Sequence, residues 1–248
     1  MTIDINHLQK ELGPKSAPEV IAWAVKTYGQ KLTFANSFGA EDVVLTALIA
    51  QANPKASIFT LDTGRLPQET YAVWAALEQK YGIRIQPYFP ERSAVESMVQ
   101  EKGINLFYES VENRKLCCHI RKVEPLQRAL KGKDAWITGL RREQAVTRTD
   151  IHKIEKDTGN QLMKLNPLAD WTEKQVWDYI KQNKVPYNQL HDQGYRSIGC
   201  APCTRAVKPD EDVRAGRWWW ENPEHKECGL HIRKNDRNTK NKTQDIKN

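Results

Sequence analysis

Five cysteines are the residues of this 248-residue chain whose type and spacing point most directly to chemistry. Cys117 and Cys118 are adjacent, Cys200 and Cys203 form a Cys-x-x-Cys pair, and Cys228 stands alone near the C-terminus. Two close pairs supply four sulfur ligands, and both zinc and iron–sulfur clusters bind thiolates. A lone thiol can act as a nucleophile once it is ionised, or it can be chemically idle. Spacing alone leaves both interpretations of Cys228 open.

The two cysteine pairs allow three interpretations: buried thiols without a ligand, structural zinc, or an iron–sulfur cluster. An adjacent pair argues against zinc, because a tetrahedral ion is usually held by wider spacing. A [4Fe–4S] cluster takes four thiolates, and the nearby Arg121 and Lys122 would offset its negative charge. We therefore predict one [4Fe–4S] cluster per chain, held by Cys117, Cys118, Cys200 and Cys203.

Three polar turns that follow expected strands could bind an anion. Ser37-Phe38-Gly39-Ala40-Glu41-Asp42 joins a strand to a helix, where backbone N–H groups and the helix N-terminus attract phosphate. The turns at 61–66 and 139–144 follow two further strands, and both carry arginine. One such turn is weak evidence, but three at strand ends predict a nucleotide site. Its expected contacts are Ser37, Phe38, Gly39, Asp42, Asp62, Gly64, Arg65, Gly139, Arg141, Arg142 and Gln144.

Alternating apolar segments predict an α/β fold. We expect strands at 31–36, 56–61, 83–89 and 134–139, and helices at 18–29, 43–51, 67–81, 91–102, 112–131 and 172–182. Such alternation builds a parallel twisted sheet with helices on both faces, and ligands bind beyond the carboxyl ends of its strands. We expect one α/β domain over 1–221, with the nucleotide and iron–sulfur sites, and a mobile segment over 222–248 that carries Cys228.

The region after Asn183 loses periodicity and predicts an irregular C-terminal segment folded over the sheet edge. It contains Trp218-Trp219-Trp220, which could anchor this segment to the core or stack on adenine. The anchor is the simpler interpretation of three consecutive tryptophans.

Composition and charge favour a cytoplasmic protein that binds small anions. The formal charge is +7, but residues 233–248 hold six basic and two acidic residues and so supply +4 of it. This distribution argues against nucleic acid as a partner. The chain has no apolar run of about 18 residues or more, so we expect no membrane span. Its N-terminal residues lack a secretory signal, which predicts the cytosol, where disulfides are rare.

Several motifs together resemble the assimilatory adenosine 5′-phosphosulfate (APS) reductases. The most specific are Cys117-Cys118-x-x-Arg121-Lys122-x-x-Pro125-Leu126 and Gly199-Cys200-x-x-Cys203-Thr204. Further matching blocks lie at 37–42, 61–70, 139–144, 164–168, 214–221 and 227–231, so that the resemblance covers about residues 20–232. It implies an adenine nucleotide α-hydrolase-like sheet, a [4Fe–4S] cluster and thioredoxin as reductant.

The resemblance also implies roles for single residues. Cys228 would attack APS and form an S-sulfocysteine, which thioredoxin would resolve to sulfite. Lys122, Arg214 and Arg217 would screen the sulfate, and Arg65 with Arg141 or Arg142 would hold the phosphate or ribose. Together these steps form part of assimilatory sulfate reduction, which supplies cysteine biosynthesis.

Three other functions remain open from the sequence. A reductase could use 3′-phosphoadenosine 5′-phosphosulfate (PAPS), or both nucleotides, although PAPS enzymes generally lack the four cluster cysteines. A tRNA-thiolating ATP pyrophosphatase is less consistent with Phe38, which replaces the first glycine of that family's Ser-Gly-Gly-x-Asp-Ser loop. A zinc-stabilised nucleotide-binding protein without redox activity is the third. A homo-oligomer is compatible with every one of these functions.

Overall fold

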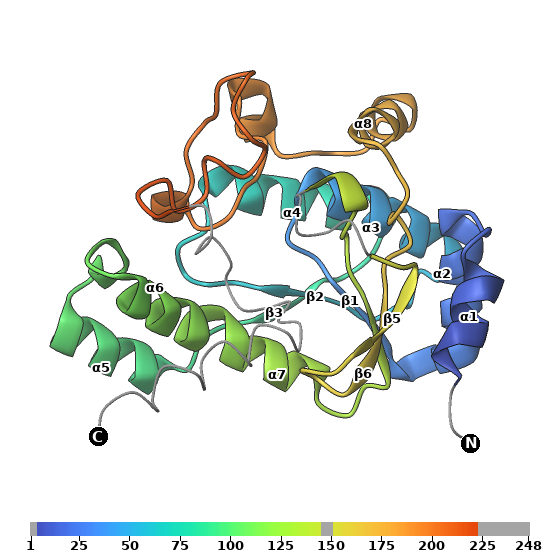
Figure 1. The fold of residues 1–248 in the computed structure, drawn as a ribbon, viewed down its shortest axis with the longest axis horizontal. Coiled ribbons are helices and arrows are strands. Elements are labelled where there is room, and N and C mark those ends of the chain that lie inside the picture. The colour runs from blue at the N-terminus through green and yellow to red at the C-terminus, as the bar shows by residue number, and fades with distance from the viewer. Residues whose placement is uncertain (1–3, 145–150, 223–248) are drawn as a thin grey trace, which may run out of the picture.

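The computed structural model describes residues 4–144 and 151–222, and its centre is a six-stranded sheet (Figure 1). The strands are β1 (Leu32–Ala35), β2 (Ile58–Leu61), β3 (Gln86–Tyr88), β4 (Ala135–Ile137), β5 (Ile154–Asp157) and β6 (Leu162–Leu165). Their order is β3-β2-β1-β4-β6-β5, and every neighbouring pair is parallel except β5 with β6. The expected parallel sheet is therefore confirmed, with one antiparallel strand at its edge.

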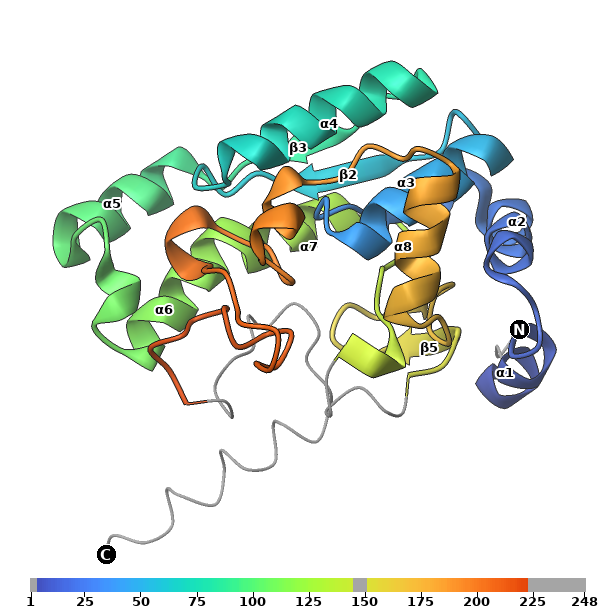
Figure 2. The same cartoon turned by 90° about the horizontal axis from the view of Figure 1, so that it is seen from above.

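Helices cover both faces of this sheet, as predicted (Figures 1 and 2). The helices are α1 (Ile5–Leu12), α2 (Ala17–Tyr28), α3 (Ala40–Ala52), α4 (Gln68–Tyr81), α5 (Arg92–Lys102), α6 (Val111–Cys118), α7 (Glu124–Leu130) and α8 (Glu173–Gln182). One face carries α3, α4 and α8, and the opposite face carries α5, α6 and α7. No helix within the described ranges is both long enough and apolar enough to cross a membrane.

The predicted helix at 112–131 is present, but a π-helical turn at His119–Val123 divides it into α6 and α7. The turn begins directly after the adjacent cysteines that end α6. A π-turn adds a residue to one helical turn and rotates the side chains that follow, and such turns often occur at functional sites. Arg121 and Lys122 both lie within this turn.

Three elements were not anticipated, namely α1, β5 and β6. The strand β5 reads Ile-Glu-Lys-Asp and has only one buried residue, so it shows no apolar run. A tight turn joins it to β6, and in this turn Asp157 accepts hydrogen bonds from the backbone N–H groups of Gly159 and Asn160. Because a short turn connects only antiparallel strands, the edge strand reverses the direction of the sheet.

The strand order places a topological switch point between β1 and β4. The chain leaves β1 toward β2 on one side of the sheet and leaves β4 toward β6 on the other side. The two loops that follow β1 and β4 therefore diverge and leave a crevice at the carboxyl edge, where ligands bind in open α/β sheets. A ligand is therefore expected to bind at the turns at 36–39 and 138–144.

Candidate active site

The turn after β1 is built around a buried carboxylate. The backbone N–H and the hydroxyl of Ser37 both donate to Asp42 Oδ2, at 2.7 and 2.6 Å. Phe38 has a φ of 62°, a region that favours glycine, and its backbone N–H donates to Asn36. Its ring is buried and stacks on Trp74 at 5.6 Å. Aromatic packing thus holds the conformation that a glycine would adopt freely at this position.

A pocket of about 260 Å³ opens at the crevice between the turns after β1 and β4. Eight of the predicted substrate contacts line it, namely Ser37, Gly39, Asp42, Lys122, Gly139, Gln144, Arg214 and Arg217. They come from four separate parts of the sequence, so the fold brings them together. Gly139 is required for this approach, because a Cβ atom there would collide with Asp42 Oδ1.

The burial of Asp42 makes it the main pH-sensitive group of this turn. Desolvation raises its pKa from 3.8 to about 6, although the hydrogen bonds from Ser37 act in the opposite direction. A carboxyl whose pKa is raised in the folded state binds its proton more tightly there than in the unfolded chain. Its contribution to stability is therefore complete below about pH 4 and is lost as the pH rises through about 6.

We expect Asp42→Asn to remove this pH dependence. A pKa shift of about two units corresponds to roughly 3 kcal/mol. Between pH 4 and pH 7 the unfolding free energy of the native protein should therefore fall by about that much relative to that of the variant. Chemical denaturation of both proteins at several pH values measures the difference. A difference that stays constant over this range would show that Asp42 ionises normally.

The second predicted turn, after β2, supports the cysteine loop. Asp62 is buried and accepts from Gly64 N–H at 2.8 Å and from the Tyr71 hydroxyl at 2.9 Å. The backbone carbonyl of Arg65 accepts from Ala201 N–H at 2.8 Å, between the two cysteines of the Cys-x-x-Cys pair. Asp62, Gly64 and Arg65 thus lie outside the nucleotide pocket and brace the loop beside it.

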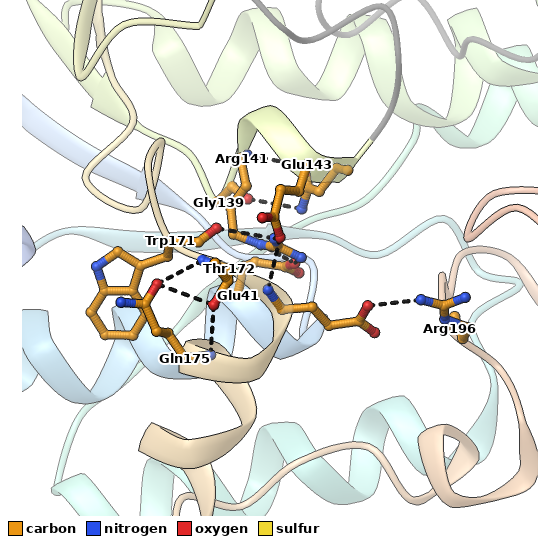
Figure 3. A network of polar contacts seen from close by, with 10 residues as sticks. Glu41, Gly139, Arg141, Glu143, Trp171, Thr172, Gln175 and Arg196 are labelled. Carbon is orange, nitrogen blue, oxygen red and sulfur yellow. Dashed lines mark hydrogen bonds and ion pairs between the residues drawn. The ribbon is translucent and has the colours of Figure 1, made fainter.

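The arginine of the third turn that we expected to hold the substrate is engaged by protein groups (Figure 3). Arg141 is buried, pairs with Glu41 at 2.8 Å and donates to the Trp171 carbonyl at 3.2 Å. Arg142 Nε donates to the carbonyl of Ile151 at 2.9 Å. Arg141 connects the start of α3 to the turn after β4, and both of these segments line the pocket. Arg141 itself lies outside the pocket and holds them together.

Many residues that line the pocket were not among the predicted contacts, and four polar examples are informative. Asn36, His191, Arg196 and Ser197 line the cavity together with the predicted residues. Arg196 is held by an ion pair of 2.7 Å to Glu173, at the start of α8 (Figure 3). Arg196 and Ser197 lie within four residues of Cys200, so their proximity to the cysteine motif was a signal that could have identified them.

The four paired cysteines gather at one end of this pocket. Cys117, Cys118, Cys200 and Cys203 are buried and line a second, smaller cavity. Lys122, Arg217 and Trp218 line both cavities and form the wall that they share. Gly199 leaves room for the Arg217 guanidinium, which a Cβ atom at this position would displace. The thiols and the nucleotide pocket are therefore separated by two cationic side chains.

The pKa values of the buried thiols indicate that a cationic metal group would help them to ionise together. Burial and the charge of Cys200 raise the pKa of Cys203 to about 12. Burial also raises the pKa of Cys200, but the charge of Lys122, a hydrogen bond with Thr63 and the charge of Arg217 outweigh it and lower the pKa overall. The thiols oppose one another's ionisation, and a bound cation would remove that repulsion.

The four thiols are compatible with an iron–sulfur cluster. In the part of the chain that the structure describes, no three His, Cys, Asp or Glu side chains are arranged to hold a single metal ion. A cluster places each thiolate on a different iron, so four thiols around one cavity are the required arrangement. Arg121 Nε and Trp218 Nε1 are buried beside this cavity without an acceptor among the described residues, and cluster sulfur accepts hydrogen bonds.

The end of the described chain is fixed beside these cysteines. Arg114 in α6 forms two hydrogen bonds to Glu221, at 2.9 and 2.8 Å, and the two side chains are 0% and 3% exposed. The indole of Trp218 lies between the guanidinium groups of Arg114 and Arg217, each 4.8 Å from the ring. Trp218 therefore acts as the expected anchor of the C-terminal segment.

We expect Glu221→Gln to destabilise the protein by about 3 kcal/mol, because it removes the carboxylate that forms a buried ion pair with Arg114. Replacing both partners with apolar residues, as in Arg114→Met with Glu221→Leu, should recover most of the loss. Denaturation midpoints of the native, single and double variants test this. Equal losses in the single and double variants would mean that packing, and not charge, stabilises this contact.

Cys228 lies outside the described residues, six positions beyond Asn222. The buried anchor at Trp218 and Glu221 fixes the start of the segment that carries it.

Comparisons with known proteins agree with this arrangement. Residues 31–206 match the family model of the phosphoadenosine phosphosulfate reductase domain. An Allochromatium vinosum protein named adenosine 5′-phosphosulfate reductase is 52% identical over 231 residues, 91% of this chain and 90% of that protein. A Burkholderia cepacia protein of the same name is 55% identical over 202 residues, 82% of this chain and 81% of that protein.

A solved structure shows the same fold. The crystal structure of a phosphoadenylyl-sulfate (PAPS) reductase from Candida auris, in complex with phosphate, has a TM-score of 0.72 and 31% identity to this chain. The match covers 84% of this chain and 99% of that one. The expected adenine nucleotide α-hydrolase-like sheet is therefore confirmed. From its sequence and its fold, the chain belongs to the APS/PAPS reductase family.

Proposed function

We propose that the chain reduces APS to sulfite and AMP in the cytosol, with Cys228 as nucleophile, thioredoxin as reductant and one [4Fe–4S] cluster. The reaction belongs to assimilatory sulfate reduction for cysteine biosynthesis. The observation that best supports it is one pocket that combines an anion-binding turn with a cationic wall, shared with a cavity of four thiols. The names of the relatives support APS as the substrate.

The pocket suggests how APS is oriented. Ser37 and Gly39 lie at the start of α3, where backbone N–H groups favour the 5′-phosphate. Lys122, Arg214 and Arg217 line the pocket, two of them at its thiol end, so the sulfate would lie there. Gly139 and Gln144 would contact the nucleoside. Phe38, Asp62, Gly64, Arg65, Arg141 and Arg142 would act through the turns that they hold.

The first chemical step transfers a sulfo group to Cys228. The thiolate attacks the sulfur of the sulfate, an S–S bond forms, and the bond from that sulfur to the bridging oxygen breaks. AMP leaves with the electron pair, and Cys228 is left as S-sulfocysteine. Thiolate and substrate are both anionic, so Lys122, Arg214 and Arg217 must screen the sulfate for the attack to proceed.

The second step regenerates the enzyme. A thioredoxin thiolate attacks the sulfur of Cys228, and sulfite leaves with the electron pair of the broken S–S bond. The second thioredoxin thiol then resolves the mixed disulfide, so that thioredoxin becomes a disulfide and Cys228 a thiol. The dithiol loses two electrons, which the sulfate sulfur gains as it becomes sulfite. A segment over 222–248 must therefore reach both the pocket and the partner.

The four cysteines Cys117, Cys118, Cys200 and Cys203 would hold the cluster. When bound, it supplies a fixed charge distribution beside the sulfate end of the pocket. The shared wall of Lys122 and Arg217 would screen the sulfate on one side and the thiolate ligands on the other. None of the bond changes described above requires the cluster to change its oxidation state.

Sulfite release from APS and from PAPS, measured with the same thioredoxin system, tests the substrate. We expect a kcat/KM at least tenfold higher for APS. An equal or higher value for PAPS would assign the chain to the PAPS-using or dual-specificity branch of the family.

A further inference from the structure

Four large hydrophobic side chains of the described residues are exposed to solvent, and two of them lie side by side. Among the described residues they are Phe89, Ile104, Tyr108 and Trp219, which are 54%, 53%, 43% and 39% exposed. The Tyr108 and Trp219 rings are 6.3 Å apart, and each ring packs against Trp220. We call Tyr108, Trp219 and Ile104 the aromatic patch, because the two rings are in contact and Ile104 lies four residues before Tyr108. Phe89 directly follows β3 and is not counted in the patch.

The patch is held rigidly, although its faces are open. The Tyr108 hydroxyl donates to the Pro202 carbonyl at 2.7 Å, which connects the patch to the cysteine loop. Arg65 donates to the Ile104 carbonyl at 2.6 Å and lies over the Phe107 ring at 5.1 Å. Rigid tyrosine and tryptophan side chains lose little entropy on association and are enriched where binding energy is concentrated.

Anchoring of the C-terminal segment does not explain the exposure of Trp219. The C-terminal segment is anchored by the buried Trp218, which contacts two guanidinium groups, and by Glu221, which pairs with Arg114. Exposed apolar surface costs free energy, and an organised group of such residues typically marks an interaction site. A partner that covers the patch would remove this cost.

The number of residues between Asn222 and Cys228 limits where a partner that reacts with Cys228 can bind. Cys228 follows Asn222 by six residues, and six extended residues span at most about 20 Å. Asn222 itself is three residues from Trp219. A typical interface covers about 800 Å² on each partner, which corresponds to a disc with a radius of about 16 Å. A protein whose thiol reaches the sulfur of Cys228 must therefore bind within this range of Asn222, and the patch lies in that range.

We infer that the aromatic patch formed by Ile104, Tyr108 and Trp219 is the docking surface for the dithiol reductant, thioredoxin. The inference rests on the proposed function, because it requires a protein dithiol to attack the sulfur of Cys228. It adds that the partner binds the folded domain beside the cysteine loop, and not only the segment that carries the sulfo group.

Trp219→Ser tests this, with Phe89→Ser as the matched control at an exposed aromatic outside the patch. We expect Trp219→Ser to raise the thioredoxin concentration for half-maximal rate at least tenfold. Its iron content, the amount of sulfo adduct formed without reductant, and its rate with dithiothreitol should stay within twofold of the native values. Phe89→Ser should match the native protein in every measurement, and Ile104→Ser should show a rise of at least threefold.

Other results would overturn the inference in recognisable ways. Equal thioredoxin requirements for Trp219→Ser and Phe89→Ser would remove the patch from the docking surface. Loss of adduct formation in Trp219→Ser would place Trp219 in the substrate site instead. A change only in the oligomeric state would assign the patch to a second copy of the chain. If the native protein itself forms no adduct, the proposed function has failed, which is distinguishable from all these outcomes.

Discussion

Replacing Cys228 with serine is expected to abolish sulfite formation, with a loss of at least about 1,000-fold in kcat. A serine hydroxyl is not ionised near neutral pH and cannot replace a thiolate in attack on sulfur. The covalent sulfo adduct should disappear together with turnover. Iron content and AMP affinity should stay unchanged, because the other four cysteines and the pocket lie in the folded domain. Sulfite assays, intact-mass analysis and iron determination measure these quantities.

The separation of these effects distinguishes a nucleophile from a structural cysteine. A Cys228→Ser variant that still turns over would show that another group attacks the substrate. A variant that loses iron would show that Cys228 is a ligand, and the assignment of the cysteines would then be wrong.

The second large effect is expected at the paired cysteines. Cys117→Ser should lower the iron content from about four per chain to less than one and remove the visible absorption of the cluster. Activity should fall by at least about 100-fold, because Lys122 and Arg217 line the cysteine cavity and lose the group that fixes their position beside the sulfate. Iron analysis and visible spectroscopy of freshly purified protein provide the readout, with Cys228→Ser as the matched cysteine control.

Two outcomes would contradict this expectation. Native protein that is colourless and loaded with zinc would support the zinc-stabilised alternative. A Cys117→Ser variant with full iron and full activity would exclude Cys117 from the ligand set.

Much of the fold could be predicted because its helices and central strands carry strong periodic patterns. Each expected strand and helix is present, with ends that shift by up to three residues. The missed edge hairpin has a different physical origin. The only buried residue of β5 is Ile154, so the turn sequence Asp157-Thr158-Gly159-Asn160 was the one available signal. The π-turn after Cys118 has no sequence pattern of its own.

The site could be predicted only in part, because side chains of one motif serve different purposes. The turn at 37–42 places Ser37 and Gly39 in the pocket, while Phe38 turns into the core and stacks on Trp74. Arg141 looked like a substrate contact, but the carboxylate of Glu41 lies a hundred residues earlier and engages it. Local sequence does not reveal such long-range ion pairs. The gathering of the four cysteines was predictable, because their spacing has few other uses.

The most direct test of the account mixes the purified native protein with APS labelled in its sulfate sulfur, without any reductant. We expect close to one label per chain to become covalently attached, and peptide mapping to find it on the fragment that contains Cys228. Addition of thioredoxin should release that label as sulfite. The absence of bound label, or label on a peptide that contains one of the four paired cysteines, would contradict the account.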